Sequence, residues 1–500
     1  MLDWLVRAIH ADNRDQLRRG FEWLYRFVRP QRRAIGGLLA LSLLASLLVL
    51  LQPWLTKLLI DEGLLARDYG MLVTMALTMI LVGVLGTALG GVNRYLHTRL
   101  SGRILFALRG DLYAHLQKLS PAFFGQRRIG DLLSRIDGDV AEIQRFAVDS
   151  LFSAVSSIIG LIGALIMMLT LSPQLSLLVL VLIPLEVLWL RWMRRKVELR
   201  ARRVRERSAD LSSFLVETLP AMKFIQSVGQ ERRERGHLDR HSDNYLADLL
   251  KLQVTEFFTH AIPGTLTSLT RAAAFLIGGW WVINGQWQLG SLIAFSTYLG
   301  MATGPVNSLL GLYVAIQRMS VSLGRVSELR QAPVSITSDE TPLQLPADLR
   351  GDVEFSDLSF AYPGREQPVF EGVDCRIGAG EKVALSGASG VGKSTLIDLL
   401  QRHFDPTRGS IRLDGIDLKR LSLTDLRRAV AVVSQDITLF RGTLADNIRY
   451  AAPGASDEQV LEAARQARLG EMIEALPQGL ETLMGERGQQ LSGGQRQRIA

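Results

Sequence analysis

Residues 387–394 read Gly-Ala-Ser-Gly-Val-Gly-Lys-Ser, and this glycine-rich stretch decides the fold of the region around it. It follows a short apolar run, Glu381 to Ser386, that we predict to be a strand. It precedes an amphipathic segment, Thr395 to Arg402, that we predict to be a helix. Strand, glycine-rich turn and helix are the context in which this pattern forms a phosphate-binding P-loop. The glycines let backbone N–H groups approach phosphate oxygens, and the start of the helix adds a favourable dipole.

The polar residues of this P-loop have predicted roles. Lys393 is expected to reach the β- and γ-phosphates of a nucleotide, and Ser394 is expected to ligate Mg²⁺. A glycine-rich turn alone would be weak evidence, but eight positions in the right frame favour nucleotide binding over a purely structural turn. The predicted nucleotide-binding residues here are Gly387, Ala388, Ser389, Gly390, Val391, Gly392, Lys393, Ser394 and Thr395.

The sequence before the P-loop divides into a linker and a strand-rich region. Residues 331–350 hold three prolines and no helical period, which is typical of a linker. Beyond them, short alternating segments predict strands at Val353–Phe355 and Leu358–Phe360. We therefore place an α/β P-loop domain at residues 351–500.

Long runs without charge dominate the first two thirds of the chain. A membrane-spanning helix needs about 20 apolar residues to cross about 30 Å of hydrocarbon. The runs with at most one charged residue are residues 34–56, 71–93, 151–190 and 261–317. The third run breaks at Ser172-Pro173-Gln174 and the fourth breaks at Asn284-Gly285-Gln286. The sequence therefore predicts six spans in a transmembrane domain at residues 34–330.

Arginine and lysine are distributed asymmetrically around the predicted spans. The chain has a net charge of +8, and its basic residues gather before the first span and in the connections that follow the second and fourth spans. Cytoplasmic connections carry such an excess, so we expect a multi-pass protein of the cytoplasmic (inner) membrane with both termini in the cytoplasm. A nucleic-acid partner is the competing explanation, and we exclude it because no aromatic patch interleaves with the arginines.

The two long connections are predicted to be helical hairpins that project into the cytoplasm. A continuous helix from Met71 to Leu119 would be about 70 Å long, far more than the thickness of the hydrocarbon. The hairpins are expected to turn at Ser120-Pro121 and at Leu219-Pro220, where the helical pattern is interrupted. Residues 1–33 form a cytoplasmic N-terminal segment, in which Leu17 to Val28 is predicted to lie along the membrane surface as an amphipathic helix.

A second motif, Leu491-Ser492-Gly493-Gly494-Gln495, lies just over a hundred residues after the P-loop. Alone it could be a loop before a helix, but together with the P-loop it resembles the signature of ABC ATPases. The resemblance implies that Ser492, Gly493, Gly494 and Gln495 contact nucleotide. It also implies that Tyr362 stacks on adenine, that Gln435 touches Mg²⁺ and the attacking water, and that Lys393 and Gln435 act in catalysis.

Three further stretches narrow the resemblance to exporters. Residues 482–488 resemble the loop before the signature in exporters, with Met484 where valine is usual. Residues 121–130 and 219–231 resemble the two cytoplasmic turns of bacterial lipid and multidrug exporters. In that family these turns are coupling helices that sit on the nucleotide-binding domains. The chain from about Leu17 onward is similar to a half-transporter with fused transmembrane and ATPase domains.

The resemblance implies a multi-domain membrane protein with an all-α six-helix transmembrane domain, long cytoplasmic helical extensions and a following α/β ABC ATPase domain. The expected function is ATP-driven export of a hydrophobic or amphipathic substrate by alternating access in a dimer, with ATP and Mg²⁺ as cofactors. A homodimer is expected, and a heterodimer with a second half-transporter stays open. An ATP-gated channel or membrane regulator on the same fold is the alternative.

Two expectations concern residues outside these motifs. Arg271 is the only charge between Ala261 and Gln317, and we predict that it lines the translocation cavity. A structural pair with Glu186, or snorkelling toward the surface, is an equal alternative. The family's Walker B aspartate, catalytic glutamate, D-loop and switch histidine would follow Ala500. We therefore expect the coding sequence to continue for roughly 70–100 residues, which would give the ATPase a common domain size.

Overall fold

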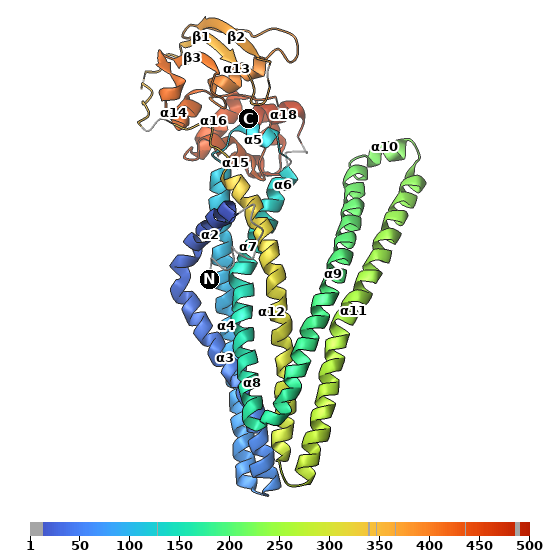
Figure 1. The fold of residues 1–500 in the computed structure, drawn as a ribbon. Coiled ribbons are helices and arrows are strands. Elements are labelled where there is room, and N and C mark those ends of the chain that lie inside the picture. The colour runs from blue at the N-terminus through green and yellow to red at the C-terminus, as the bar shows by residue number, and fades with distance from the viewer. Residues whose placement is uncertain are drawn as a thin grey trace. The chain divides into compact units, whose positions relative to one another are not determined.

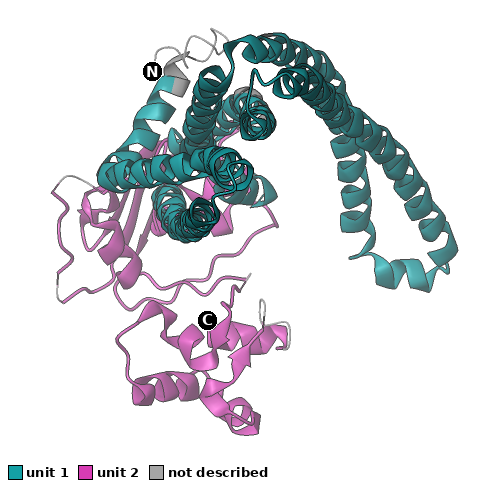
Figure 2. Ribbon diagram, turned by 90° about the horizontal axis from the view of Figure 1, so that it is seen from below, with its two compact units in different colours: residues 1–117, 127–332 teal, residues 118–126, 333–500 magenta. Residues whose placement is uncertain are grey.

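The computed structural model describes residues 14–127, 129–338, 341–346, 348–365, 367–435, 437–485 and 491–500. Figure 2 shows the two compact units into which the chain divides. Unit 1 comprises residues 1–117 and 127–332, and its described part is helical. Unit 2 comprises residues 118–126 and 333–500, and its described part combines helices with small sheets. Residues 1–13 of the predicted N-terminal segment lie outside the described residues.

Unit 1 is built from long helices joined by short turns (Figure 1). The long helices are α2 Arg14–Val28, α3 Arg32–Leu58, α4 Tyr69–Leu116, α8 Leu151–Leu171, α9 Pro173–Thr218, α11 Glu231–Ile283 and α12 Leu289–Arg330. The shorter pieces are η2 Arg29–Gln31, η3 Leu59–Leu65, α6 Ile129–Leu133, η4 Ser134–Asp139, α7 Val140–Arg145, η5 Phe146–Ser150 and α10 Met222–Ser227.

The predicted spans lie on six of these helices, which are α3, α4, α8, α9, α11 and α12. Within the described residues, five helical segments are long and apolar enough to cross a membrane. They are Arg18–Leu65, Tyr69–Leu116, Ile129–Leu171, Pro173–Thr218 and Glu231–Ile283. The sixth predicted span corresponds to α12, which has 42 residues and no charged side chain from Leu289 to Gln317. The chain is thus a multi-pass membrane protein with a helical transmembrane domain.

The predicted breaks between helices are confirmed, and local capping explains them. Helix α4 begins after Asp68, whose Oδ1 accepts the backbone N–H of Met71 at 3.0 Å. Ser172 separates α8 from α9, and its Oγ accepts the N–H of Leu175 at 3.3 Å. Gly285, with φ +71°, follows the end of α11. With 48 residues, α4 is about 72 Å long, so it extends well beyond a bilayer as predicted.

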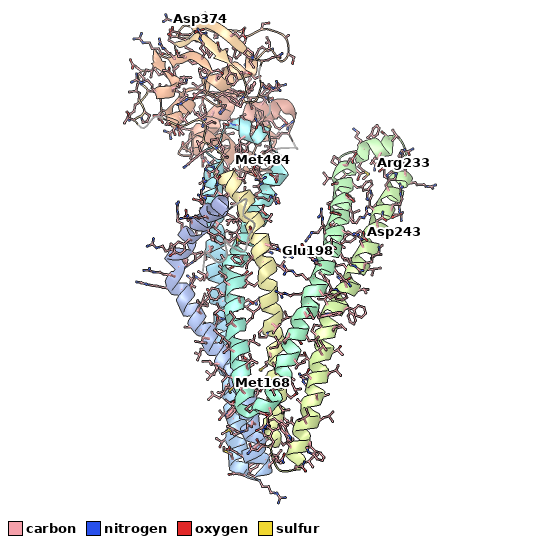
Figure 3. The ribbon with its side chains drawn as sticks, viewed as in Figure 1. Met168, Glu198, Arg233, Asp243, Asp374 and Met484 are labelled. Carbon is pink, nitrogen blue, oxygen red and sulfur yellow. The ribbon has the colours of Figure 1, made fainter. Side chains whose placement is uncertain are left out.

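The core of unit 1 gathers around Tyr298 of α12. This residue and its neighbours Phe295 and Leu299 are fully buried, and they pack with apolar residues of α3, α8, α9 and α11. Met168, labelled on α8 in Figure 3, belongs to the same cluster. The Tyr298 hydroxyl donates a hydrogen bond of 2.6 Å to the carbonyl oxygen of Leu50, so its polar group is satisfied inside an apolar core.

The apolar face of α2 packs on protein. Trp23 is only 2% exposed, because α2 lies against α4 and α12. Its Nε1–H donates to Asp111 Oδ2 of α4 at 2.8 Å, and the Arg330 guanidinium at the end of α12 lies 4.8 Å from the Trp23 ring centroid. That residues 17–28 lie along the membrane surface stays a prediction, and the structure adds that Phe21, Trp23 and Leu24 are buried against protein. The helical period serves a contact inside the protein.

Ion pairs join α6 and η4 to the last turns of α12. Arg135 pairs with Asp131 at 2.9 Å and with Glu328 at 2.7 Å, and Arg325 pairs with Asp131 at 3.0 Å. Hydrogen bonds from Arg127 and Arg135 hold the pKa of Glu328 below its usual range. No sequence motif marks Glu328. Glu328 follows the uncharged run that ends at Gln317. This position is the only indication in the sequence that Glu328 pairs with the basic connection after the second span.

Unit 2 contains a four-stranded antiparallel sheet with the strand order β2-β1-β3-β4. The strands are β1 Val353–Phe360, β2 Phe370–Ile377, β3 Arg408–Leu413 and β4 Ile416–Asp417. The two strands predicted at 353–355 and 358–360 form the single strand β1, in which the pairing register shifts around Asp357. Helix α13 Lys393–Leu400 covers the sheet, and its Leu399 is buried in the first core with Phe355.

A second hydrophobic core lies in the later part of unit 2. It includes Leu444, Ile473, Met484 and Ile499. The elements after the first sheet are η6 Leu418–Arg420, α14 Leu423–Ala429, β5 Gly442–Thr443, α15 Leu444–Ile448, η7 Arg449–Ala451, α16 Asp457–Gln466, α17 Gly470–Ala475, η8 Gly479–Glu481, β6 Leu483–Met484 and α18 Gly493–Ile499. Of these, α14 contributes its buried leucine to the first core.

Unit 2 also takes in two segments that precede its sheet. Residues 118–126, with the short helix α5 Pro121–Gly125, cluster with residues 333–500. Part of the predicted linker packs on the same unit. The N–H of Leu343 donates to the carbonyl of Arg420 at 2.8 Å, and Arg402 Nη2 donates to the carbonyl of Thr337 at 3.1 Å.

The turn between β3 and β4 fixes the end of this linker. Asp414 has φ +48°, and its carboxylate accepts the backbone N–H groups of Arg350, Gly351 and Asp352 at 2.6, 3.0 and 2.7 Å. These hydrogen bonds, that of Arg350 above all, hold the pKa of Asp414 below its usual range. The chain therefore enters β1 at a fixed point.

We expect Asp414→Asn to lower the free energy of unfolding of unit 2 at neutral pH by about 1–2 kcal/mol, because the three backbone N–H groups would then bond to a neutral amide oxygen at a half-buried site. The folded pKa of Asp414 is depressed. Its stabilisation is therefore complete above the unfolded pKa of about 3.9 and is lost as pH falls through the lower folded pKa. Wild type and variant should therefore converge in acid.

A fluorophore on Cys375, the only cysteine and an exposed one, would report the denaturation of unit 2 at neutral and acid pH. Asp348→Asn, at an exposed position of the linker, is the control and should change little at either pH. A difference for Asp414→Asn that is the same at both pH values would contradict the prediction.

Candidate nucleotide-binding site

The backbone of the P-loop requires glycine at two positions. Gly390 has φ +84° and Gly392 has φ +105°, conformations that L-residues with a side chain rarely adopt. A Cβ on Gly390 would meet no atom within 4 Å. A Cβ on Gly392 would lie 2.5 Å from Val369 Cγ1 and 3.0 Å from Phe370 Cζ. Gly392 is thus fixed both by its dihedral angle and by a wall of apolar side chains.

Helix α13 begins directly after Gly392 and positions the polar P-loop residues. Its apolar side is held in the first core, and Thr395 is buried beside it. The Lys393 ammonium folds back over the loop and donates hydrogen bonds of 2.9 Å to the carbonyl oxygens of Gly387 and Ala388. Ser394 is exposed at the start of the helix. A flexible cation and a hydroxyl therefore stand at the glycine-rich turn, as phosphate binding requires.

Tyr362 is joined to the P-loop through a hydrogen bond. Its hydroxyl lies 2.8 Å from Thr395 Oγ1, and either atom can be the donor. The ring packs edge-on against Phe360 and Phe404, with centroid distances of 5.1 and 5.3 Å. The structure thus brings Tyr362 next to the predicted phosphate cradle. Its stacking on adenine stays a prediction.

The strand predicted at Glu381–Ser386 is wrong for this structure. The segment pairs with no strand among the described residues, and its Val383 and Leu385 are 47% and 48% exposed. A strand needs a neighbour that satisfies its backbone groups, so an apolar pattern alone does not make one. The stretch before Gln435 is likewise unpaired, with Val433 exposed. Gln435 itself is exposed, and no described contact links it to the P-loop.

The signature motif opens helix α18. Ser492 Oγ accepts the N–H of Gln495 at 3.2 Å, and Gln495 Oε1 accepts the N–H of Ser492 at 2.8 Å. This reciprocal capping box explains why a helix begins here. Gly493 and Gly494 have open space where a Cβ would be. The helix is anchored by Ile499 in the second core, whereas the P-loop is anchored in the first.

The exporter-like loop before the signature is only partly described. Residues 486–490 lie outside the described residues. Within the described part, Leu483 and Met484 form β6, which pairs with β5. Met484 is buried in the second core, so the unusual methionine at this position fills apolar space. It is labelled in Figure 3.

Arg271, the predicted substrate residue, lies in unit 1 on α11 and is exposed. Its Nη2 lies 2.7 Å from the point where a Cβ on Gly300 of α12 would sit, so the absence of a side chain there makes room for the guanidinium. Glu186 contacts Thr267 rather than Arg271, with 3.0 Å between Oε1 and Oγ1. The alternative of a structural pair between Arg271 and Glu186 is therefore wrong for this conformation.

Comparison with known proteins finds a family match for each half of the chain. Residues 35–306 match the family model described as ABC transporter transmembrane region, and residues 370–500 match the model described as ABC transporter. The chain is 30% identical over 481 residues to a putative multidrug export ATP-binding/permease protein of Bacillus subtilis. That alignment covers 95% of this chain and 83% of the relative.

Two further likenesses agree with this match. The chain is 32% identical over 479 residues to an ATP-dependent lipid A-core flippase of Chromobacterium violaceum, covering 94% of this chain and 82% of the flippase. Its fold is similar to a solved bacterial Atm1-family ABC exporter with ATP bound, with a TM-score of 0.72 and 26% identity. That likeness covers 94% of this chain and 82% of the solved chain.

The two constrained glycines give a graded test of the loop. Gly390→Ala imposes a strained backbone angle, which costs about 1–2 kcal/mol and should weaken nucleotide binding about 5–30-fold. Gly392→Ala adds a contact of 2.5 Å with Val369 and should weaken binding further. Titration of the purified chain with a fluorescent ATP analogue measures both losses. Equal losses in the two variants would show that the apolar wall behind Gly392 does not support the loop.

Proposed function

The chain belongs to the ABC transporter family, and from that premise we propose that it exports a hydrophobic or amphipathic substrate across the cytoplasmic membrane by alternating access in a dimer. The two family matches identify an ATP-hydrolysing transporter with fused membrane and ATPase regions. The observation that carries the proposal is the P-loop. Its glycines at positive φ and Lys393 lie on the same chain as six long helices that contain the uncharged runs.

ATP would be held by the P-loop residues, and Mg²⁺ would be held mainly by the nucleotide. No group of three or more His, Cys, Asp or Glu side chains among the described residues could hold a metal ion by itself. This fits Mg²⁺, which is usually bound through one or two protein ligands and substrate phosphates. Ser394 and Gln435 would be those ligands, and the bound ion would neutralise charge on the phosphates. When nucleotide binds, the Lys393 ammonium would break its hydrogen bonds to the carbonyls of Gly387 and Ala388 and contact the phosphates instead.

The division of unit 2 into two cores supports a dimeric site. The P-loop is anchored in the first core and the signature in the second. No described hydrogen bond or ion pair joins residues 387–395 to residues 492–495. Two chains arranged head to tail would bring the P-loop of one against the signature of the other and bury two ATP molecules between them. A homodimer satisfies this with one gene product, and a second half-transporter would satisfy it equally.

The cytoplasmic turns would couple nucleotide binding to the spans. The first turn, with α5, already clusters with unit 2, which supports its movement with the ATPase. The second turn, residues 219–231 with α10, connects α9 and α11. Closure of the dimer around ATP would move both turns and switch the spans from inward-facing to outward-facing. ATP drives this change because it binds one of the two states better.

The proposed substrate class rests on the membrane half. The curated relatives are named as a lipid A-core flippase and a multidrug export protein, both of which suit amphipathic cargo. In this chain Arg271 is an exposed cation within a run of otherwise uncharged residues, and no described hydrogen bond or ion pair neutralises it. A guanidinium at membrane depth is costly unless water or an anion meets it. We therefore assign Arg271 to the anionic group of the substrate. The basic connections support a cytoplasmic position for both termini.

We expect Lys393→Ala to abolish ATP-dependent transport while membrane insertion is unchanged, because Lys393 contacts phosphate and contributes nothing to the spans. Flux of an amphipathic probe against its gradient into inverted vesicles measures the effect. Lys419→Ala, which removes an exposed lysine of the same unit, is the matched control. Wild-type flux in Lys393→Ala would overturn the ATPase assignment. Flux that only follows the gradient in the wild type would favour an ATP-gated channel.

Arg271→Gln should lower affinity for anionic amphiphiles more than for neutral ones, while basal ATPase activity persists, because only the anionic group loses a charge partner. Arg271→Lys keeps the charge and should fall between wild type and the glutamine variant. The affinities are read from substrate-stimulated ATPase activity with a charged and an uncharged probe of matched chain length. An equal loss for both probes would assign Arg271 a structural role.

A further inference from the structure

Glu186 is a carboxyl group buried inside the predicted membrane region. It lies on α9 and is only 1% exposed. It is the only charged residue between residues 151 and 190. Helix α9 packs along α11 and also contacts α8 and α12. The one described hydrogen-bond partner of Glu186 is Thr267 of α11, whose Oγ1 lies 3.0 Å from Glu186 Oε1. The established ATPase chemistry and the substrate assignment of Arg271 do not use this group.

The Thr267 hydroxyl has one hydrogen but two acceptors in reach. Its Oγ1 is 3.0 Å from Glu186 Oε1 and also 3.0 Å from the carbonyl oxygen of Pro263. The other Ser and Thr side chains between residues 255 and 270 all donate to the carbonyl one turn earlier in α11. If Thr267 does the same, its oxygen lone pairs face the Glu186 oxygen. A hydrogen bond between them then requires the hydrogen to come from the Glu186 carboxyl group.

Among the described residues, no cation forms a hydrogen bond or ion pair with Glu186. The titratable side chains within or beside the apolar runs of the neighbouring helices are Arg191 on α9, Glu256, His260 and Arg271 on α11, and Tyr298 and Arg318 on α12, whereas α8 carries none. Arg271 reaches toward Gly300, and the Tyr298 hydroxyl donates to Leu50. None of these side chains forms a described hydrogen bond or ion pair with Glu186. An ionised carboxylate without such a partner is far less stable in an apolar interior than the neutral acid.

Each of the two helices that form this pair contains a proline nearby. Pro184 lies two residues before Glu186 within α9, and Pro263 lies four residues before Thr267 within α11. A proline inside a helix lacks the N–H that would bond to the preceding turn, and such positions are where helices kink. These prolines lie close to the Glu186–Thr267 pair, so a kink at either of them would alter the contact between α9 and α11 there.

We propose that Glu186 binds a proton between α9 and α11 in this conformation and exchanges it with water when the two helices move apart at their prolines. On opening, the carboxyl O–H bond breaks, the proton passes to water, and a hydrated carboxylate remains. On closing, the carboxylate takes a proton from water and returns to Thr267. The ligand of the site is the proton itself. Its binding is independent of the proposed transport function, whereas its release during the ATP cycle rests on that function.

Infrared spectroscopy of the full-length protein in lipid nanodiscs can detect the proton directly. We expect the carbonyl stretching band of a protonated carboxyl group at neutral pH in wild type and its loss in Glu186→Gln. Thr267→Val removes the acceptor and should move the band to higher frequency, whereas Thr267→Ser keeps the hydroxyl and should leave the band in place. Glu198→Gln, at an exposed position on the same helix (Figure 3), is the control and should not change the band.

Three outcomes would overturn the proton site. They are an identical spectrum in Glu186→Gln, a band in Thr267→Val that does not move, and equal loss of the band in Glu198→Gln. The use of two residues keeps the test decisive if one variant fails to fold, because the shift in Thr267→Val does not require a change at Glu186.

Exchange is tested by transfer into heavy water. The band should shift slowly without nucleotide and faster once Mg²⁺ and ATP are added, because the helices must separate before water reaches Glu186. Lys393→Ala should show the slow rate under both conditions. Nucleotide titration reports whether ATP binds. If it binds and the exchange rate does not change, proton release is not coupled to the ATP cycle. If ATP does not bind, the transport proposal fails while the proton site stands.

Discussion

The free-energy cost of placing a charge in hydrocarbon is the constraint on which the membrane half of this protein depends. It keeps charged residues out of the runs that form the spans, and it gathers arginines in the connections between them. The same low polarity forces each span to satisfy its own backbone, so the membrane half is helical throughout its described part. The two exceptions, Glu186 and Arg271, show two ways of meeting that cost. One is buried against a hydroxyl group, and the other is exposed beside a glycine.

In the ATPase half the corresponding constraint is steric. The P-loop uses backbone angles that glycine adopts readily and that residues with a side chain rarely adopt, and Val369 and Phe370, just before and at the start of β2, lie close behind Gly392. The wall and the leucines of helix α13, which follows the loop, belong to the same core. The signature helix α18 is anchored in a separate core through Ile499. The P-loop and the signature are thus anchored separately. This suits the proposed site, in which the P-loop of one chain meets the signature of the other.

The helices were predictable from the sequence because their boundaries are marked locally. Ser172 and Pro173, or Asn284 and Gly285, end and restart helices through caps and backbone angles that do not depend on distant residues. The neighbours that each segment contacts are not marked locally in this way. The apolar stretch at 381–386 lacks a pairing partner, and the apolar face of α2 meets α4 and α12. Arg402 reads as the last residue of a helix, yet it is buried and bonds to the carbonyls of Leu418 and Thr337.

The ATPase unit is discontinuous along the chain, and this affects how the protein is made. Residues 118–126 leave the ribosome long before Pro333, where the rest of that unit begins. At roughly 5–20 residues per second, synthesis of the intervening stretch takes on the order of 10–40 s. During that time α5 has none of its eventual neighbours from residues 333–500 to pack against, while the spans on either side of it enter the bilayer. Completion of the ATPase unit therefore waits for the membrane half. A soluble fragment that starts at Pro333 would lack one of the unit's own pieces.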